Sequence, residues 1–326
     1  MPMLNLKNKN ILFITTKNTD YLRNVQEINL LSQDNTVDIV GYSDKSYIKR
    51  LLRVYFRLCF MSFKNYDSVF VGFAPQFILP LFNLKLKNKQ KIIDFFISVY
   101  DTLVFDRKIF KQDGIPAKLC KWLDKKCIHS ADTVICDTNA HGDYFASEFT
   151  VEREKIKTLY LSADTSVYKK QLCEKPPHLN ESFVVLYFGS VLPLQGIDVV
   201  IGSAETVCRQ KDIVFYFIGP LKKHQKIPTA SNFVHIDWLP QEKLAEYIGR
   251  ADLCLAGHFN SEIDKAKRTI PGKAYIYEAM EKPMILGENP ANHELFKPDK
   301  NHYFVEMGSS ERLSEKILEI KNAMQS

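Results

Sequence analysis

The sequence predicts an α/β protein with two doubly wound domains, each built on a parallel sheet. Short apolar runs alternate with helical stretches along the chain, and such runs suit strands that are buried on both faces of a sheet. The pattern breaks at residues 161–177 and then restarts. A length of 326 residues is sufficient for two domains of ordinary size. We therefore expect ligands to bind beyond the carboxyl ends of the strands.

The composition is that of a globular protein, with 45% hydrophobic and 25% charged residues. No apolar run approaches the about 18 residues of a membrane span, and the apolar core of residues 1–16 is too short for a signal peptide. None of the seven cysteines forms a CxxC pair, so we expect reduced thiols and a cytoplasmic protein. Residues 1–165 carry 24 Lys and Arg against 18 Asp and Glu, whereas residues 166–326 carry 20 against 20. The two halves should therefore have different partners.

Six strands are expected in the first half. They cover residues 11–15, 37–41, 68–72, 91–97, 133–136 and 158–161. The loop after the first strand contains no glycine, so we expect no nicotinamide or flavin cofactor. The eight histidines lack the spacing of a zinc site, and we expect no metal either.

Asp101 is the candidate catalytic residue of the first half, because it follows the strand expected at 91–97. An acid in this place could act as a base toward an acceptor hydroxyl, or it could orient a sugar. The structural alternative is that Asp101 caps the next segment or pairs with Arg107.

Residues 47–64 predict one helix without Gly or Pro that carries a basic stripe. The stripe contains Lys49, Arg50, Arg53, Arg57 and Lys64. It is either a solvated face of a largely buried helix or a surface that docks on an anionic membrane or a lipid diphosphate. Four more lysines at positions 85–91 favour the membrane interpretation. No nucleic-acid-binding motif accompanies the charge, so we expect no nucleic-acid partner.

The second half repeats the α/β pattern and ends in a helix. Its expected strands cover residues 184–188, 213–218, 233–236, 253–256, 284–287 and 303–305. Two of them end in glycine turns at Gly189 and Gly219, where glycine lets the backbone approach a ligand closely. The helix expected at 310–324 could pack back across the linker.

Residues 262–287 combine a cationic loop, a helix and a strand. The loop and the helix start contain Lys265, Lys267, Arg268 and Lys273, and Pro271 is well suited to a first helical position. Free N–H groups at a helix start, beside cations, make a site for a diphosphate. Glu278 lies about 10 Å further along the same face and could accept hydrogen bonds from sugar hydroxyls. The alternative is a solvated basic loop before an ordinary amphipathic helix.

The second half resembles the donor domain of GT-B glycosyltransferases of family 4. The resemblance is carried by an ordered set of segments, namely LSADTSVY, YFGSVLPLQGIDVVIGSAE, FYFIGP, NFVHIDWLPQEKLAEYIGRADLCLA and IPGKAYIYEAMEKPMIL. It implies two facing Rossmann-like domains with a cleft between them. Residues 1–165 would bind the acceptor, residues 166–308 the donor, and residues 309–326 would form a helix that can pack on the first domain.

The resemblance also implies an activity and a set of site residues. Members are typically metal-independent, retaining hexosyltransferases that move a sugar from a UDP- or GDP-linked donor to a glycan or lipid-linked acceptor. The implied role is surface-polysaccharide synthesis at the inner face of the cell membrane. Glu278 matches the glutamate expected at the nucleotide ribose, and Gly189 matches the glycine of the first donor loop. The other donor-binding residues expected here are Ser190, Gln195, Gly219, Lys265, Arg268 and Lys273.

Several positions depart from the family pattern. Ile270 stands where the family has a glutamate, which Glu262 could replace. Ser190 or Val191, and Gln195, stand where it has an arginine and a lysine, and Tyr100 where it has a histidine. Arg268 and Lys273, helped by Lys265 or Lys267, must then balance the charge of a departing diphosphate. The departures favour one alternative, a non-catalytic partner with this fold. A GT-B-fold epimerase or phosphorylase is a further possibility, which no sequence feature favours.

Overall fold

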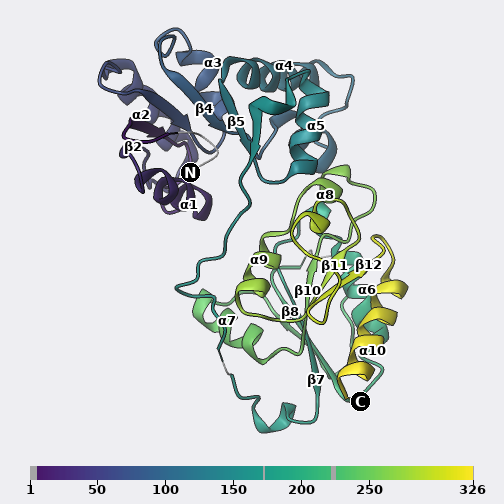
Figure 1. Ribbon diagram of the computed structural model, residues 1–326. Helices are drawn as coiled ribbons and strands as arrows, with labels where there is room; N and C mark the ends of the chain where they lie inside the picture. Colours follow the sequence, from purple (N-terminus) through teal and green to yellow (C-terminus); the bar gives the residue numbers. More distant parts are fainter. Residues whose placement is uncertain (1–5, 172, 222–224, 326) are drawn as a thin grey trace. The chain divides into compact units, whose positions relative to one another are not determined.

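The computed structural model describes residues 6–171, 173–221 and 225–325, so the first five residues of the apolar N-terminal segment lie outside it. The chain divides into two compact units, Met1–Leu161 and Ser162–Ser326. Each unit contains a parallel sheet of six strands with helices packed against it (Figure 1). This confirms the predicted fold class. The expected boundary at residue 165 lies four residues beyond the observed one.

The first unit has the strand order β2-β1-β3-β4-β5-β6. Its strands are β1 (Asn10–Ile14), β2 (Thr36–Val40), β3 (Ser68–Val71), β4 (Gln90–Asp94), β5 (Thr133–Cys136) and β6 (Ile156–Thr158). Its helices are α1 (Leu22–Ser32), α2 (Tyr47–Phe60), α3 (Leu79–Phe82), α4 (Ile115–Ser130) and α5 (Asn139–Phe149), with a π-helical turn at Asp101–Asp106.

Helices α2 to α5 cover one face of this sheet, and α1 covers the other. The core under α2 to α5 joins Val54, Phe82, Ile128 and Phe145 to side chains of the strands. On the opposite face, Leu31 of α1 packs in a second core with residues of β1, β3, β4 and β5. The strands are therefore buried on both faces, as their continuous apolar runs predict.

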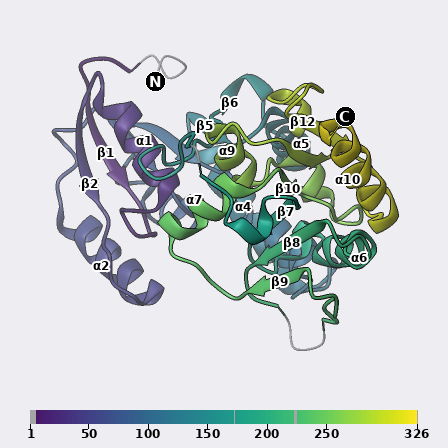
Figure 2. The same ribbon diagram turned by 90° about the horizontal axis from the view of Figure 1, so that it is seen from below.

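The second unit has the strand order β12-β11-β10-β7-β8-β9. Its strands are β7 (Phe183–Phe188), β8 (Ile213–Ile218), β9 (Phe233–Ile236), β10 (Leu253–Gly257), β11 (Met284–Gly287) and β12 (His302–Val305). Its helices are α6 (Ile197–Val207), α7 (Gln241–Arg250), α8 (Asp264–Arg268), α9 (Gly272–Ala279) and α10 (Ser310–Gln325). In Figures 1 and 2, α10 lies alongside α6.

The C-terminal helix packs on the core of its own unit, and its packing on the first domain stays a prediction. Leu313, Ile317 and Ile320 of α10 join the core of the second sheet. Lys321 forms an ion pair of 2.6 Å with Asp212 and donates a hydrogen bond of 2.8 Å to Gln210. The amphipathic pattern of residues 310–324 is therefore explained by the second unit alone.

Two strand predictions differ from the structure at their ends. The strand predicted at 91–97 ends at Asp94 as β4, because the next residues turn to form hydrogen bonds with Asp124. The strand predicted at 158–161 is β6, which begins at Ile156 and ends at Thr158. In both places the apolar run continues past the strand, and the first residue after it, Phe95 or Leu159, is also buried.

Candidate functional site

Two glycine turns form a close approach at the carboxyl edge of the second sheet. Gly189 follows β7 with φ +154°, and Gly219 follows β8 with φ +143°. A Cβ added at Gly219 would lie only 2.0 Å from the carbonyl oxygen of Gly189. Only glycine can occupy position 219, because any side chain would clash with this carbonyl oxygen and positive φ values disfavour other residues. The two predicted glycines are therefore brought together, and they hold the turns after neighbouring strands against each other.

Lys273 is buried beside these turns. It is the second residue of α9, and its side chain is only 5% exposed. Its Nζ donates a hydrogen bond of 2.7 Å to Oε1 of Gln195 and lies 3.9 Å from the centroid of the Tyr187 ring. A Cβ added at Gly189 would lie 2.8 Å from the same Nζ. Gly189 and Gln195, predicted from the loop after β7, thus meet Lys273, predicted from the start of α9.

The surroundings of Lys273 disfavour its charged form. Burial lowers the pKa of the Lys273 ammonium well below its usual range. The ammonium exchanges water for a neutral amide and a π face, which compensate only part of the lost hydration. Burial also raises the pKa of the neighbouring Tyr187 hydroxyl, so this phenol remains neutral. An anion placed beside Nζ would favour the charged amine.

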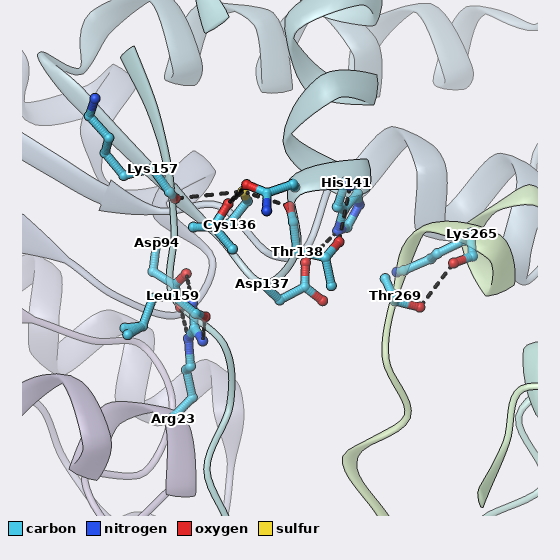
Figure 3. Close-up of polar contacts among 12 residues, drawn as sticks. Arg23, Asp94, Cys136, Asp137, Thr138, His141, Lys157, Leu159, Lys265 and Thr269 are labelled. Atoms are coloured by element: carbon cyan, nitrogen blue, oxygen red, sulfur yellow. Dashed lines mark hydrogen bonds and ion pairs between the residues drawn. The ribbon is translucent and has the colours of Figure 1, made fainter. Parts of the chain in front are cut away.

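The cationic segment before α9 packs on the loop that carries Gln195. Ile263 and Ala266 of the α8 region form a small apolar cluster with Leu194. Thr269, which follows α8, donates a hydrogen bond of 2.9 Å to the carbonyl of Lys265 (Figure 3). These contacts position α8 next to the Gln195 loop.

The four predicted cations of this segment differ in their surroundings. Lys273 is buried, whereas Arg268 and Lys265 are partly exposed. Lys267 is exposed and forms an ion pair of 3.0 Å with Asp264. The segment therefore contains one buried amine, that of Lys273, and three cations that are partly or fully exposed to solvent. Ser190, next to Gly189, is exposed.

The structure does not bring Glu278 to the Lys273 cluster. The Glu278 carboxylate is exposed and accepts a hydrogen bond of 2.7 Å from Nε2 of His302. His302 is the first residue of β12 and pairs with Met284, so it lies at the amino edge of the sheet. The glycine turns lie at the carboxyl edge. Ile270 is buried, Glu262 is exposed, and the assignment of Glu278 to a ribose stays a prediction.

Asp101 in the first unit is buried at the start of the π-helical turn. Its N–H donates a hydrogen bond of 2.9 Å to Oγ of Ser98. Ser98 in turn donates to Asp124 of α4 at 2.7 Å, and the backbone N–H of Tyr100 donates to the same carboxylate at 2.8 Å. Asp124 also accepts from Gln76 at 2.9 Å. Burial raises the pKa of Asp124 to about 6, although these hydrogen bonds act in the opposite direction.

Sequence reasoning missed Asp124, which organises the loop that carries Asp101. It lies 23 residues further along the chain, inside a helix, and no local pattern connects it to that loop. The only available signal was an acidic residue among apolar ones in the stretch between two predicted strands. Such a residue needs a buried partner.

A second polar cluster lies at the strand ends of the first sheet (Figure 3). Arg23 of α1 donates two hydrogen bonds of 3.0 Å to the Asp94 carboxylate and one of 2.5 Å to the carbonyl of Leu159. Glu27 lies 3.2 Å from the same guanidinium, and burial raises the pKa of the Glu27 carboxyl. The bidentate geometry supports the interpretation of Asp94 as a structural polar residue. We had not identified Arg23 or Glu27 from the sequence.

Asp137 and His141 form a further pair in Figure 3. Nδ1 of His141 lies 2.7 Å from the Asp137 carboxylate, just beyond the end of β5. Burial opposes ionisation of Asp137, but His141 and the hydrogen bond to it hold the pKa of this carboxyl below its usual value. The sequence analysis had counted His141 among scattered histidines.

The basic stripe predicted on a helix at residues 47–64 is wrong for two of its members. The helix α2 ends at Phe60, so Lys64 lies beyond it. Lys49, Arg53 and Arg57 are exposed. Arg50 is buried, donates hydrogen bonds to the carbonyls of Thr16 and Asp44, and therefore belongs to the interior of the unit. Position 50 shares the inward face with Val54 and Leu58, because residues four apart lie on the same side of a helix.

The comparisons with known proteins agree with this architecture. Residues 182–322 match the model of the family described as Glycosyl transferases group 1. The matched region is similar to glycosyltransferase group 1 domains. It covers most of the second unit, including the glycine turns, Gln195 and Lys273. The chain matches no curated protein sequence at a significant level.

Solved structures share the fold over nearly the whole chain. Sucrose-phosphate synthase from Thermosynechococcus elongatus matches with a TM-score of 0.70 and 11% identity, over 97% of this chain and 90% of that one. HepE from Anabaena, in complex with UDP-glucose, matches with a TM-score of 0.64 and 14% identity, over 98% and 91%. WaaG, a glycosyltransferase involved in lipopolysaccharide biosynthesis, matches with a TM-score of 0.60 and 13% identity, over 95% and 90%. At these identities the likeness shows the fold alone, which is GT-B.

Proposed function

We propose that the chain is a retaining, metal-independent glycosyltransferase. It moves a hexose from a nucleoside diphosphate to a glycan or lipid-linked acceptor at the inner face of the cell membrane. The observation that carries the proposal is the buried amine of Lys273, held by Gln195 between a helix start and two glycine turns. The group 1 match and the GT-B fold support the same class of enzyme.

The position of Lys273 suits the diphosphate of the donor. A helix start favours an anion through its N–H groups and dipole. Burial makes the amine costly to protonate without an anion, and a phosphate would remove that cost. The resembled family carries a lysine at the position of Gln195. Here the amine of Lys273 reaches Gln195 from the helix, so the cation has moved from the loop to the helix start while staying at the same place in the fold.

The leaving group determines how this cation would act in the reaction. When the acceptor hydroxyl attacks the anomeric carbon, the bond to the diphosphate breaks and negative charge grows on the phosphate oxygens. A protonated Lys273 would offset that charge, with Arg268 and Lys265 adding partly solvated charge nearby. The acceptor hydroxyl would pass its proton to a donor phosphate oxygen. This charge balance is what allows transfer without a metal ion.

Asp101 is proposed to orient the acceptor or the reacting sugar. Its loop is fixed by Asp124 through Ser98 and the backbone N–H groups of Val99 and Tyr100. A loop held rigidly in this way would suit Asp101 for keeping a sugar or acceptor hydroxyl in one orientation. If Glu278 binds the ribose, its carboxylate must give up the hydrogen bond from His302 and accept hydrogen bonds from the sugar hydroxyls instead.

UDP is the nucleotide that the structural neighbours favour. HepE is in complex with UDP-glucose, and the TarM structure contains UDP. GDP is the second candidate, because the family resemblance implies either a UDP-linked or a GDP-linked donor. WaaG acts in lipopolysaccharide biosynthesis, which supports a surface glycan as the acceptor.

The test is sugar transfer from a panel of UDP- and GDP-linked hexoses by purified protein in the presence of EDTA. Lys273→Met should lower the transfer rate by about 10²–10³-fold, because one electrostatic donor to the leaving group is lost. Lys170→Met is the matched control, since Lys170 forms an exposed ion pair with Glu281 in the same unit. Unchanged transfer by the folded Lys273→Met variant would remove the assignment.

The second candidate is a non-catalytic partner with the same fold. Ile270 in place of a glutamate, and Glu278 bonded to His302, are the observations that favour it. Calorimetric titration with UDP and GDP separates the two candidates. Binding to either nucleotide that depends on Lys273 supports the transferase, and no binding to any nucleotide supports the partner.

A further inference from the structure

Three neighbouring helices of the first unit present an unusually apolar outer surface. Helices α2, α3 and α4 cover the same face of the sheet and pack on one core. The described residues include 17 exposed large apolar side chains, and nine of them lie on or next to these helices. We call these nine the apolar ridge; its members are Ile48, Leu52, Phe56, Phe60, Leu81, Leu84, Ile115, Leu119 and Trp122.

Helix α2 shows why the ridge is not a by-product of core packing. Val54 and Leu58 already provide the contacts of α2 with the core. Phe56 and Phe60 are 70% and 78% exposed, and their rings contact each other at a tilt of 52° with centroids 4.8 Å apart. An aromatic pair on the side away from the core costs solubility and contributes little to folding. Large exposed apolar patches mark surfaces that bind something.

Cations border the ridge on each helix. On α2, Lys49, Arg53 and Arg57 form a row beside the apolar row, and residues 47–66 contain no acidic side chain. A hollow of about 320 Å³ next to the end of α2 is lined by Phe63, Leu84 and the lysines at 64, 85, 87 and 89. On α4, Lys118, Lys125 and Lys126 are exposed.

Few acidic groups counter this charge. Asp44 forms an ion pair of 2.7 Å with Arg53, and Glu148 of α5 forms one of 2.5 Å with Lys121. Asp124 on α4 is buried and accepts its hydrogen bonds from within the unit. The outer surface of the three helices is therefore both apolar and positively charged.

This combination selects the kind of partner. A second copy of the chain would place like charges against each other at the border of the ridge. A nucleic acid would use the cations but leave the exposed Phe, Leu and Ile side chains without a suitable contact. An anionic bilayer fits both parts, because its phosphates meet the lysines and its acyl chains receive the apolar side chains.

We propose that the apolar ridge and its cations dock the first unit on an anionic lipid bilayer, with α2 and α4 lying in the plane of the interface. Phe56, Phe60 and Trp122 enter the boundary between headgroups and acyl chains, and Lys49, Arg57 and Lys64 contact the headgroups. No helix in the described ranges is both long and apolar enough to cross a membrane. The inference deepens the membrane part of the proposed function, although docking itself requires no catalysis.

The two tryptophans of the chain provide a direct test. Trp122 lies on the ridge and is 57% exposed, whereas Trp238 lies in the second unit and is 75% exposed. Single-tryptophan proteins, made with Trp238→Phe or Trp122→Phe, are mixed with phosphatidylglycerol vesicles that contain brominated acyl chains. We expect the emission of Trp122 to shift to the blue and to be quenched, and the emission of Trp238 to remain unchanged.

Sedimentation with the same vesicles tests the ridge by substitution. The double variant Phe56→Ser/Phe60→Ser should reduce partitioning at least about tenfold, because two inserting rings are lost. Ile227→Ser/Leu295→Ser is the control, since both residues are exposed in the second unit, and it should bind as the wild type does. Binding should weaken with rising salt and be much lower on phosphatidylcholine vesicles.

Three outcomes would overturn the inference. They are no sedimentation with anionic vesicles, quenching of Trp238 instead of Trp122, and self-association that depends on Phe56 without any vesicle binding. Lys273→Met should bind vesicles like the wild type. Vesicle binding together with absent sugar transfer would therefore reject the proposed function and retain the docking surface.

Discussion

Replacing Lys273 by methionine should change how the stability of the second unit depends on pH. The folded amine has a lowered pKa because of burial, while an unfolded lysine titrates near about 10.4. Between these two values the unfolded chain binds one more proton than the folded chain. Stability of the wild type therefore rises with pH in that interval, by up to about 1.4 kcal/mol per pH unit.

The variant lacks this titrating group. Methionine fills a similar volume without a charge to desolvate, so Lys273→Met should be more stable than the wild type at pH 7. The advantage should shrink as the pH rises toward about 10. All other titrating groups are common to both proteins and cancel in the difference between their unfolding free energies. A Lys273 amine that kept its ordinary pKa in the folded state would instead give a difference that does not change with pH.

Urea unfolding at pH 7, 8, 9 and 10 measures this difference. The Trp122→Phe background leaves Trp238 as the only tryptophan, so its fluorescence reports the second unit. Lys170→Met serves as the control and should follow the wild type at every pH, because Lys170 is exposed. A Lys273→Met variant with the same pH slope as the wild type would refute the reasoning.

Two further predictions concern the stability of each unit. Gly219→Ala should destabilise the second unit by about 2 kcal/mol, because φ is +143° and the new Cβ would meet a carbonyl oxygen at 2.0 Å. The control is Gly114→Ala, at φ −72° with its nearest contact at 3.1 Å. It should cost much less in the same urea titration. Arg23→Leu should destabilise the first unit by about 3–5 kcal/mol, because two buried carboxylates lose their cation, whereas Arg53→Leu should cost below about 1 kcal/mol at an exposed ion pair. Trp238 fluorescence reports unfolding of Gly219→Ala, and Trp122 fluorescence reports unfolding of the three variants in the first unit. Equal costs within either pair of variants would contradict the structural explanation.

The order of the elements was predictable because strands buried on both faces leave a clear trace in the sequence. Each of the twelve predicted apolar runs corresponds to a strand of the two parallel sheets. The ends of the strands were less predictable than their order. The run at 91–97 stays apolar after β4 has ended, and the bonds of Asp124 to the next loop decide where the chain turns.

The candidate site was predictable where local rules apply. Gly189 and Gly219 follow strands, and Lys273 follows a proline at a helix start, so each could be found from its neighbours in sequence. The contact between Lys273 and Gln195 joins residues 78 positions apart. Neither residue alone indicates that the two side chains meet.

The side chains of Arg50 and Glu278 point in other directions than their spacing along the helices predicted. Arg50 was grouped with Lys49 and Arg53, but it lies on the inward row of α2. Glu278 was expected on the same face as the helix start, but it turns toward His302 at the other edge of the sheet. Both side chains were placed from spacing, and tertiary contacts decide which direction a polar residue on a short helix takes.

The most direct test of the central claim is the proton balance of nucleotide binding. Calorimetric titrations of UDP and GDP are carried out at pH 8 in two buffers with different enthalpies of ionisation. If the Lys273 amine takes up the charge of the diphosphate, binding should be accompanied by net proton uptake, and Lys273→Met should abolish the uptake and weaken binding. Equal affinity and equal proton uptake in the wild type and in Lys273→Met would contradict the account.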